Sequence, residues 1–472
     1  MTLLNNPSLF TKLNTKCKIG KKKIKLDFKN QDDFVHFYLG LQVAKGPLFE
    51  SSLQDHSSSK WSFFSILPKS TYTKSIDEFL LESTDLKQNG QSSFFDQIDK
   101  LIFQIHQRYP GLEQFPFIGG FMGFLSYENF FETKGALKLK QHSFPLYQFS
   151  FFKNSFLFNL ETQESFLVYD EDIVLNTFDV WRHKIKFDST PNLNNKIILQ
   201  PNISKDQYLK KIDCVFEHIK KGDIYQANFT HKFNGTFNGN PNQIYNLLRK
   251  NNPSPFSSFY AVNDHQFILC SSPERLFKVV NSKIISSPIK GTIRRDNNPI
   301  IDNQLKQELL NSPKDSAELA MIVDLIRNDL GKISNYGTVK VLDYKKLETF
   351  QKVHHLIGTV EGQLKSKTTI KEIFSALFPG GSITGAPKIR SIEILNELEE
   401  QARGPYTGSL GYIDIRGNMD FNIMIRTILI DKNAISLQVG GGIVIDSDPA
   451  KEYEETLHKA QALFDALSFS HN

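Results

Sequence analysis

The sequence has few cysteines. Cys17, Cys214 and Cys270 are the only three in 472 residues, they are widely spaced, and none belongs to a CxxC pair. An odd number of distant cysteines predicts neither a disulfide framework nor a structural zinc site. This usage is typical of a reducing compartment, and we expect a cytoplasmic protein.

Long apolar runs are also missing. No stretch approaches the roughly 18–20 apolar residues that cross a bilayer. The N-terminus, MTLLNNPSLF, lacks the basic region and apolar centre of a signal peptide. We therefore expect no membrane-spanning segment and no secretory leader.

Neither sign of charge dominates, since 56 basic residues face 51 acidic ones and leave a net charge of +5. So small an excess argues against a nucleic-acid partner and is compatible with a small anionic ligand. The densest basic run, residues 16–28, alternates Ile and Leu with lysines and predicts a strand with one solvated face. A hydrophobic content of 40% with 23% charged residues is that of a globular protein.

The length of 472 residues predicts two or three domains, or one large body of helices and strands. Residues 1–185 are rich in Phe and Ser and contain short alternating strands, including a predicted strand pair over 117–130. Residues 186–202 are polar and interrupted by prolines, so we predict a linker there and a second domain over 203–468. No regular strand–helix alternation is present, which favours an α+β fold of mostly antiparallel sheets flanked by helices.

The predicted second domain begins with a helix over 204–221, because its apolar residues recur at helical spacing. A strand follows over 225–233, with one apolar and one polar face; the polar face could meet solvent or line a site. Helices over 313–333 and 448–463 each place two carboxylates on one stripe. Such pairs are either solvated helix surface or oxygen ligands for a hard cation.

Two glycine-rich loops, residues 377–388 and 438–449, each precede a predicted helix, an arrangement that suits an anion. Lys290 lies in SSPIKGTIRR, residues 286–295. Taken alone, it would be a solvated lysine in a turn.

Seven segments together resemble the chorismate-utilising enzymes in order and spacing. They are GDIYQANFT, SSPERL, PIKGT, DLIRNDLGKI, KVHHLIG, FPGGSITGAPK and GGGIVIDSDPAKEYEETLHKA. That family includes component I of anthranilate synthase and of aminodeoxychorismate synthase, and the isochorismate and salicylate synthases. The resemblance implies an anthranilate synthase component I-like fold and a chorismate-binding catalytic domain over 203–468.

The resemblance also implies the chemistry of Lys290, because anthranilate synthases have PIAGT where this chain has PIKGT. It implies that Lys290 attacks ring carbon 2 of chorismate while Glu274 protonates the departing hydroxyl. Ammonia then gives 4-amino-4-deoxychorismate, which leads to para-aminobenzoate and folate. The neutral amine requires a lowered pKa, and Lys388, Lys459, Arg426 or a metal are candidates for lowering it.

Other roles are carried over residue by residue. The expected Mg²⁺ ligands are Glu318 and Glu455, with Asp315 and Glu452 beside them. The expected substrate-binding residues are Gln226, Thr292, His355, Ser382, Thr384, Arg426, Gly440, Gly441, Gly442 and Lys459. A tryptophan pocket is expected from Ser51, Phe256, Ser257 and Ser258 in the N-terminal signature and the NPSPFSSFY segment.

Gln226 stands where isochorismate and salicylate synthases have a water-activating lysine, which argues against those reactions. The alternative function is anthranilate synthase component I, and a non-catalytic chorismate-binding subunit is a third reading. None of the three cysteines lies in a glycine-rich nucleophile turn, so we expect ammonia from solution or from a separate glutamine amidotransferase subunit.

Overall fold

The computed structural model describes residues 21–52, 60–83, 87–89, 94–95, 98–99, 109–134, 139–170, 197–350 and 353–467. Within these ranges, no helix is both long enough and apolar enough to cross a membrane.

Two 12-stranded sheets form the body of the protein, and their pairings among the described residues are antiparallel. The first sheet has the order β1 (Lys21–Leu26), β10 (Ser165–Asp170), β9 (Asn154–Asn159), β3 (Trp61–Phe64), β2 (Leu48–Glu50), β13 (Phe256–Ala261), β14 (Gln266–Ser272), β23 (Thr427–Asp431), β24 (Ala434–Ile443), β12 (Gln226–Thr236) and β11 (Leu199–Pro201), with β20 (Gly385–Ala386) paired to β12.

The second sheet has the order β17 (Ile289–Arg294), β19 (Val353–Gln363), β16 (Lys283–Ser287), β15 (Arg275–Val280), β22 (Met419–Asn422), β21 (Ser409–Asp414), β7 (Gly120–Leu125), β8 (Tyr147–Phe152), β4 (Ser70–Lys74), β5 (Phe79–Ser83) and β6 (Lys87–Asn89), with β18 (Lys340–Thr349) paired to β19. The predicted α+β class with mostly antiparallel sheets is confirmed.

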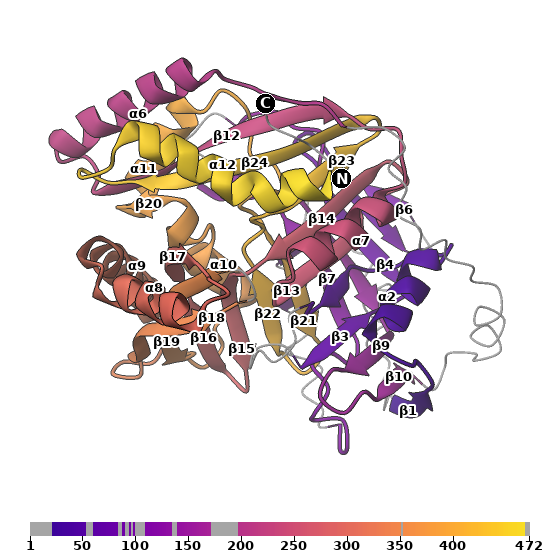
Figure 1. Ribbon diagram of the computed structural model, residues 1–472. Coiled ribbons are helices and arrows are strands. Elements are labelled where there is room, and N and C mark those ends of the chain that lie inside the picture. The colour runs from indigo at the N-terminus through magenta and orange to yellow at the C-terminus, as the bar shows by residue number, and fades with distance from the viewer. Residues whose placement is uncertain are drawn as a thin grey trace, which may run out of the picture.

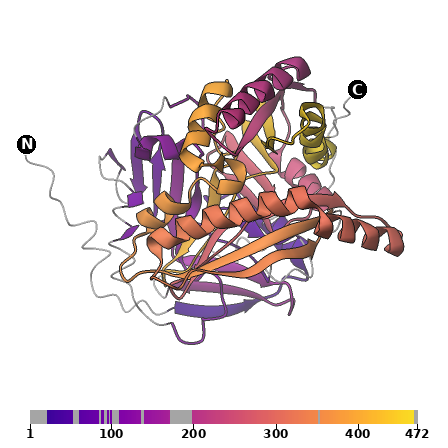
Figure 2. The same cartoon turned by 90° about the vertical axis from the view of Figure 1, so that its left-hand side faces the viewer.

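Helices flank both sheets. They are α2 (Gln31–Gly40), α4 (Asn129–Lys134), α6 (Lys205–Lys220), α7 (Pro241–Asn251), α8 (Pro299–Asn311), α9 (Pro313–Ile333), α10 (Ile370–Leu377), α11 (Lys388–Leu398) and α12 (Pro449–Ala466), with the short 3₁₀ helix η1 (Gly381–Ile383). Helices α6 and α12 lie over β12 and β24 (Figure 1). Figure 2 shows the long helix α9 crossing in front of the second sheet, where it packs on β17 and β19.

The predicted helices form for local reasons. Ser204 caps α6 with a capping box completed by Gln207, and Ser312 caps α9. Pro313 at the first turn of α9 and Pro449 at that of α12 lack an N–H that a helix would leave unpaired there. The predictions over 204–221, 225–233, 313–333 and 448–463 are confirmed.

The predicted strand pair over 117–130 is wrong. Only β7 forms there, and α4 begins at Asn129. The reason is a helical turn in which the Asn129 N–H donates to the Ser126 carbonyl, directly after the strand. In the basic run, β1 begins at Lys21 as an edge strand whose side chains are mostly exposed, and residues 16–20 lie outside the described residues.

The hydrophobic core joins the two predicted domains. One buried cluster contains Met122 and Phe149 together with Leu276 and Phe421. Each such side chain contributes roughly 1.5–3 kcal/mol when fully buried. Both sheets also combine strands from before and after the predicted linker. Residues 186–196 of that linker lie outside the described residues, and the division into domains stays a prediction.

Candidate active site

Lys290 lies on β17 at a β-bulge. The register of β17 against β19 shifts between Lys290 and Thr292, and the intervening Gly291 has φ +73°. A Cβ on Gly291 would lie 3.0 Å from the Cβ of Asp315. Glycine is therefore required at this turn both for its positive φ and for the close approach of α9.

The Lys290 amine is buried among charges. Its Nζ lies 4.0 Å from Oε2 of Glu318. Burial lowers its pKa, and the positive charge of Lys459 lowers it further, against the opposing carboxylates of Glu318, Glu274 and Glu455. The net direction is downward, which favours the neutral amine that acts as a nucleophile.

Glu274 follows the end of β14 and is also buried. The Ile289 N–H lies 3.4 Å from its Oε1. Burial raises the pKa of Glu274, and the Ser382 hydroxyl and the charge of Lys290 oppose that rise only in part. One pocket thus favours a protonated acid beside a neutral amine, the pair that acid-assisted nucleophilic attack needs.

Four carboxylates come from α9 and α12. Burial is the largest cause of the raised pKa of Glu318, and the nearby charges of Asp315 and Glu452 raise that pKa further. Glu452 accepts hydrogen bonds from Ser447 Oγ at 2.7 Å and from Lys314 Nζ at 3.2 Å. The two acidic pairs are therefore gathered at one place, and Lys314 is a neighbour that the sequence did not single out.

These carboxylates fit a magnesium ion that is shared with a ligand. Within the described ranges, no three His, Cys, Asp or Glu side chains form a metal site by themselves. Mg²⁺ commonly takes one or two carboxylates and completes its shell with water and substrate oxygens. Glu318 and Glu455 are the candidates for these two carboxylates, and the negative charges of Asp315 and Glu452, which add to the effect of burial on the pKa of Glu318, are charges that a cation would offset.

Arg426 and Lys459 supply positive charge. Arg426 is half-buried, and no carboxylate of the described residues lies within 4.0 Å of its guanidinium. Burial lowers its pKa to about 10, so it stays charged and favours an anionic ligand. The Lys459 Nζ lies 2.7 Å from Oε1 of Glu455 and donates to the Gly440 carbonyl at 3.3 Å.

His355 is held beside these groups by Thr292, whose Oγ1 lies 2.8 Å from His355 Nδ1. Burial lowers the pKa of His355 to about 3, with Arg426 adding to the effect, so the imidazole is neutral. Its Nε2 is buried and, among the described residues, has no hydrogen-bond partner. The neighbouring His354 is instead fully buried, and its Nε2 lies 2.9 Å from Oδ1 of Asp302.

The polar face of β12 turns into the site. Gln226 is fully buried, and neither atom of its amide has a hydrogen-bond partner in the described part of the chain. A Cβ on Gly442 would lie 2.4 Å from Gln226 Nε2 and 3.2 Å from Lys290 Nζ. A Cβ on Gly440 would lie 2.6 Å from the Phe229 carbonyl, and one on Gly441 3.2 Å from Glu452 Oε2. The glycines of β24 therefore keep this space open.

Ser382 and Thr384, in the loop before α11, have different surroundings. The Ser382 hydroxyl limits the rise in the pKa of Glu274, but it is buried and has no hydrogen-bond partner among the described residues. The hydroxyl of Thr384 donates to the Gly380 carbonyl at 2.9 Å, so it closes its own loop, and its substrate-binding role stays a prediction. Lys388 pairs with Asp329 at 2.6 Å; of the three side chains proposed to lower the pKa of Lys290, Lys459 is among the charges that shift it, and Lys388 and Arg426 are not.

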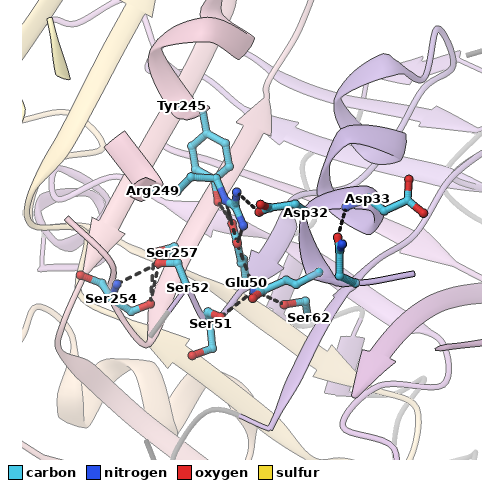
Figure 3. Close-up of polar contacts among 12 residues, drawn as sticks. Asp32, Asp33, Glu50, Ser51, Ser52, Ser62, Tyr245, Arg249, Ser254 and Ser257 are labelled. Atoms are coloured by element: carbon cyan, nitrogen blue, oxygen red, sulfur yellow. Dashed lines mark hydrogen bonds and ion pairs between the residues drawn. The ribbon is translucent and has the colours of Figure 1, made fainter. Parts of the chain in front are cut away.

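A separate cavity of about 330 Å³ lies beside β2 and β13. Its lining includes all four residues predicted for the tryptophan pocket, Ser51, Phe256, Ser257 and Ser258, with Glu50, Trp61 and Tyr412. Figure 3 shows Glu50 held by Arg249, whose Nε donates at 2.8 Å, and by the Tyr245 hydroxyl at 2.8 Å. The cavity is confirmed as a feature of the fold, and tryptophan as its ligand stays a prediction.

Comparison with known proteins identifies relatives of this arrangement. The chain matches the family model described as chorismate binding enzyme over residues 53–465. An anthranilate synthase component I-like protein of Synechocystis sp. is 40% identical over 368 residues, which are 75% of this chain and 74% of the relative. Aminodeoxychorismate synthase component 1 of Escherichia coli is 33% identical over 422 residues, which are 89% and 92% of the two chains.

The crystal structure of anthranilate synthase component I from Streptococcus pneumoniae has a TM-score of 0.75 at 27% identity, covering 87% of this chain and 93% of that chain. The fold of the present chain is therefore similar to that of this anthranilate synthase component I. The names of these relatives give two different activities, anthranilate synthase and aminodeoxychorismate synthase.

Proposed function

The chain belongs to the chorismate-binding enzyme family, and on that premise we propose that it aminates chorismate to 4-amino-4-deoxychorismate. The observation that carries the proposal is Lys290, a largely buried amine with a lowered pKa, near Glu274, a buried carboxyl with a raised pKa. A relative named aminodeoxychorismate synthase component 1, similar over most of both chains, supports the same reaction.

The first step forms a bond between Lys290 Nζ and ring carbon 2 of chorismate. Both ring double bonds shift, from C1=C2 and C5=C6 to C6=C1 and C4=C5, and the bond between carbon 4 and its hydroxyl breaks. Glu274 gives its proton to the hydroxyl, which leaves as water, since hydroxide itself is a poor leaving group. The site now holds a carboxylate at Glu274 and an ammonium linkage at Lys290.

The second step reverses the shift. Ammonia bonds to carbon 4, both ring double bonds return to C5=C6 and C1=C2, and the bond from carbon 2 to Lys290 breaks, which returns the neutral amine. The new ammonium group on carbon 4 gives one proton to Glu274. Chorismate and ammonia have become aminodeoxychorismate and water, and both catalytic residues are restored.

The remaining side chains bind and orient the substrate. Arg426 suits a carboxylate because its planar fork donates two parallel hydrogen bonds, and Lys459 adds a second cation. The Nε2 of His355 and the amide of Gln226, which have no hydrogen-bond partner within the described part of the chain, are available to polar groups of the ring. Glu318 and Glu455 would hold Mg²⁺, which when bound offsets the negative charge of a substrate carboxylate.

The source of ammonia is proposed to be a separate glutamine amidotransferase subunit, and the product is proposed to serve para-aminobenzoate and folate synthesis. Formation of anthranilate and pyruvate from chorismate is the second candidate function. It is favoured by the 40% identity to the anthranilate synthase component I-like protein. It would leave the lysine at position 290 without a covalent role.

The test combines the purified chain with chorismate, Mg²⁺ and ammonium, and identifies the products by mass. Aminodeoxychorismate is expected, and anthranilate would refute the proposal. Without ammonium, peptide mapping should find the chorismate-derived ring on Lys290, and Lys290→Ala should remove this adduct and slow turnover. A Lys290→Ala variant with wild-type turnover and no adduct in the parent would refute the covalent step.

A further inference from the structure

Arg426 is a half-buried cation, and among the described residues one side-chain hydrogen bond holds its guanidinium. It lies between β22 and β23 with φ +50°, a left-handed backbone conformation that is uncommon for a residue other than glycine. No carboxylate of the described residues pairs with it. The hydrogen bond that fixes its side chain runs from Nη1 to Oδ1 of Asn252, at 3.3 Å.

Asn252 is itself firmly anchored. It caps the end of α7, where its N–H donates to the Leu248 carbonyl at 2.8 Å, and its side chain is buried. Its Nδ2 donates to Ser271 Oγ at 3.1 Å. Because arginine only donates, Oδ1 must face Arg426 and Nδ2 must face Ser271, which fixes the orientation of the amide.

Ser271 closes a ring of contacts around the arginine. Its N–H donates to the Arg426 carbonyl at 3.1 Å, and its hydroxyl contacts the Asn252 carbonyl. Asn252 therefore holds the guanidinium while Ser271 holds the backbone of the same arginine. Both ends of Arg426 are positioned by one short segment and by β14.

A tether from the N-terminal part of the chain fixes that segment. Ser254 N–H donates to Ser52 Oγ at 2.9 Å, and Ser52 N–H donates to the Ser254 carbonyl at 3.1 Å. Ser52 Oγ also lies 2.8 Å from Ser257 Oγ (Figure 3). The acceptor facing Arg426 is thus a rigid part of the fold.

We propose that Asn252 is a positioning residue that aims the Arg426 guanidinium at a carboxylate of the substrate. A neutral amide occupies one N–H and leaves the other donors and the full positive charge for the ligand. An aspartate of the same shape would instead pair with the arginine and compete with the substrate. This inference rests on the proposed function for the identity of the substrate.

The experiment measures equilibrium binding of chorismate with Mg²⁺ and without ammonium, so the result does not depend on which product forms. Asn252→Ala is expected to weaken binding about tenfold, the usual effect of losing one hydrogen bond to a charged group. The isosteric Asn252→Asp should weaken it more, by roughly a hundredfold, because its carboxylate neutralises the guanidinium. In steady state, both variants should raise KM far more than they lower kcat.

Two controls separate positioning from a structural effect. In an Arg426→Ala background, Asn252→Ala should have no further effect on binding. Ser254→Ala removes a neighbouring hydroxyl but keeps the backbone hydrogen bonds of the tether and the Asn252 amide, so it should bind chorismate like wild type. Equal losses in both backgrounds, or tighter binding by Asn252→Asp than by Asn252→Ala, would overturn the inference. Melting temperatures identify any variant whose loss is a failure to fold. The identity of the product tests the proposed function alone.

Discussion

Removing the carboxylate of Glu318 should make the Lys290 amine more reactive and at the same time stop turnover. Glu318 is the carboxylate that most strongly raises the pKa of Lys290, and its Oε2 lies 4.0 Å from Nζ. Glu318→Gln keeps the size of the side chain and removes the charge. The pKa of Lys290 should fall, so that the neutral amine appears at a lower pH.

The size of the effect follows from the distance. Two unit charges 4.0 Å apart interact with about 4 kcal/mol at an effective dielectric constant of about 20. That is an upper bound of roughly three pKa units, at about 1.4 kcal/mol per unit. Burial raises the pKa of Glu318 itself, which reduces its ionised fraction and so makes the effect on Lys290 smaller than this bound. We expect a fall of at least about one unit, or roughly ten times more neutral amine below the pKa.

The assay is competitive acetylation of the metal-free protein across a pH series, with each lysine followed by peptide mass. The labelling midpoint of Lys290 should move to lower pH in Glu318→Gln and stay unchanged in Asp324→Asn, which removes an exposed carboxylate from the same helix α9. Turnover with chorismate should be lost in Glu318→Gln alone. An unchanged or higher midpoint would refute the electrostatic reasoning, and full turnover would remove Glu318 from the metal site.

Two other predictions concern the buried carboxyl of Glu128 and the space beside Gly442. The pKa of buried Glu128 is raised to about 7 from 4.5, so its contribution to stability is present below pH 4.5 and is lost as the pH rises through 7. Glu128→Gln should flatten the pH dependence of urea unfolding by up to about 3 kcal/mol between pH 5 and 8, and an unchanged slope would contradict this. Gly442→Ala should lower turnover at least about tenfold with little change in melting temperature, because its methyl group would push on Gln226 and Lys290. Gly331→Ala, where a Cβ meets nothing within 4 Å, is the control, and normal turnover in Gly442→Ala would show that the methyl group is accommodated.

Local patterns predicted the helices that carry the carboxylates. The apolar spacing of 313–333 and the capping serine and proline before it are properties of neighbouring residues, and α9 begins and ends as expected. The same holds for β12, whose alternation predicted one polar face. The strand pair over 117–130 failed because a single turn after Leu125 decides between a second strand and a helix.

Residues that position a site side chain from a distant part of the sequence were harder to predict. Asn252 stands in a segment that the sequence assigned to a tryptophan pocket, and nothing nearby in the chain points to Arg426, 174 positions away. Lys314 precedes Asp315 and looks like an ordinary residue of a first helical turn, although it pairs with Glu452 on another helix. A glycine next to a lysine was a usable signal, because Gly291 marks the bulge that places Lys290.

The sequence by itself determined the family resemblance, the α+β class, the main helices and the candidates for the acid, the amine and the metal-binding carboxylates. These depend on residue types and on spacings along the chain. Only the tertiary structure decided which charges act on Lys290, where Lys459 is a neighbour and Lys388 is occupied by Asp329. It also decided that both sheets draw strands from the two halves of the chain. The physical reason is that pKa values, strand neighbours and positioning contacts depend on distances across packed elements, and spacing along the sequence does not fix those distances.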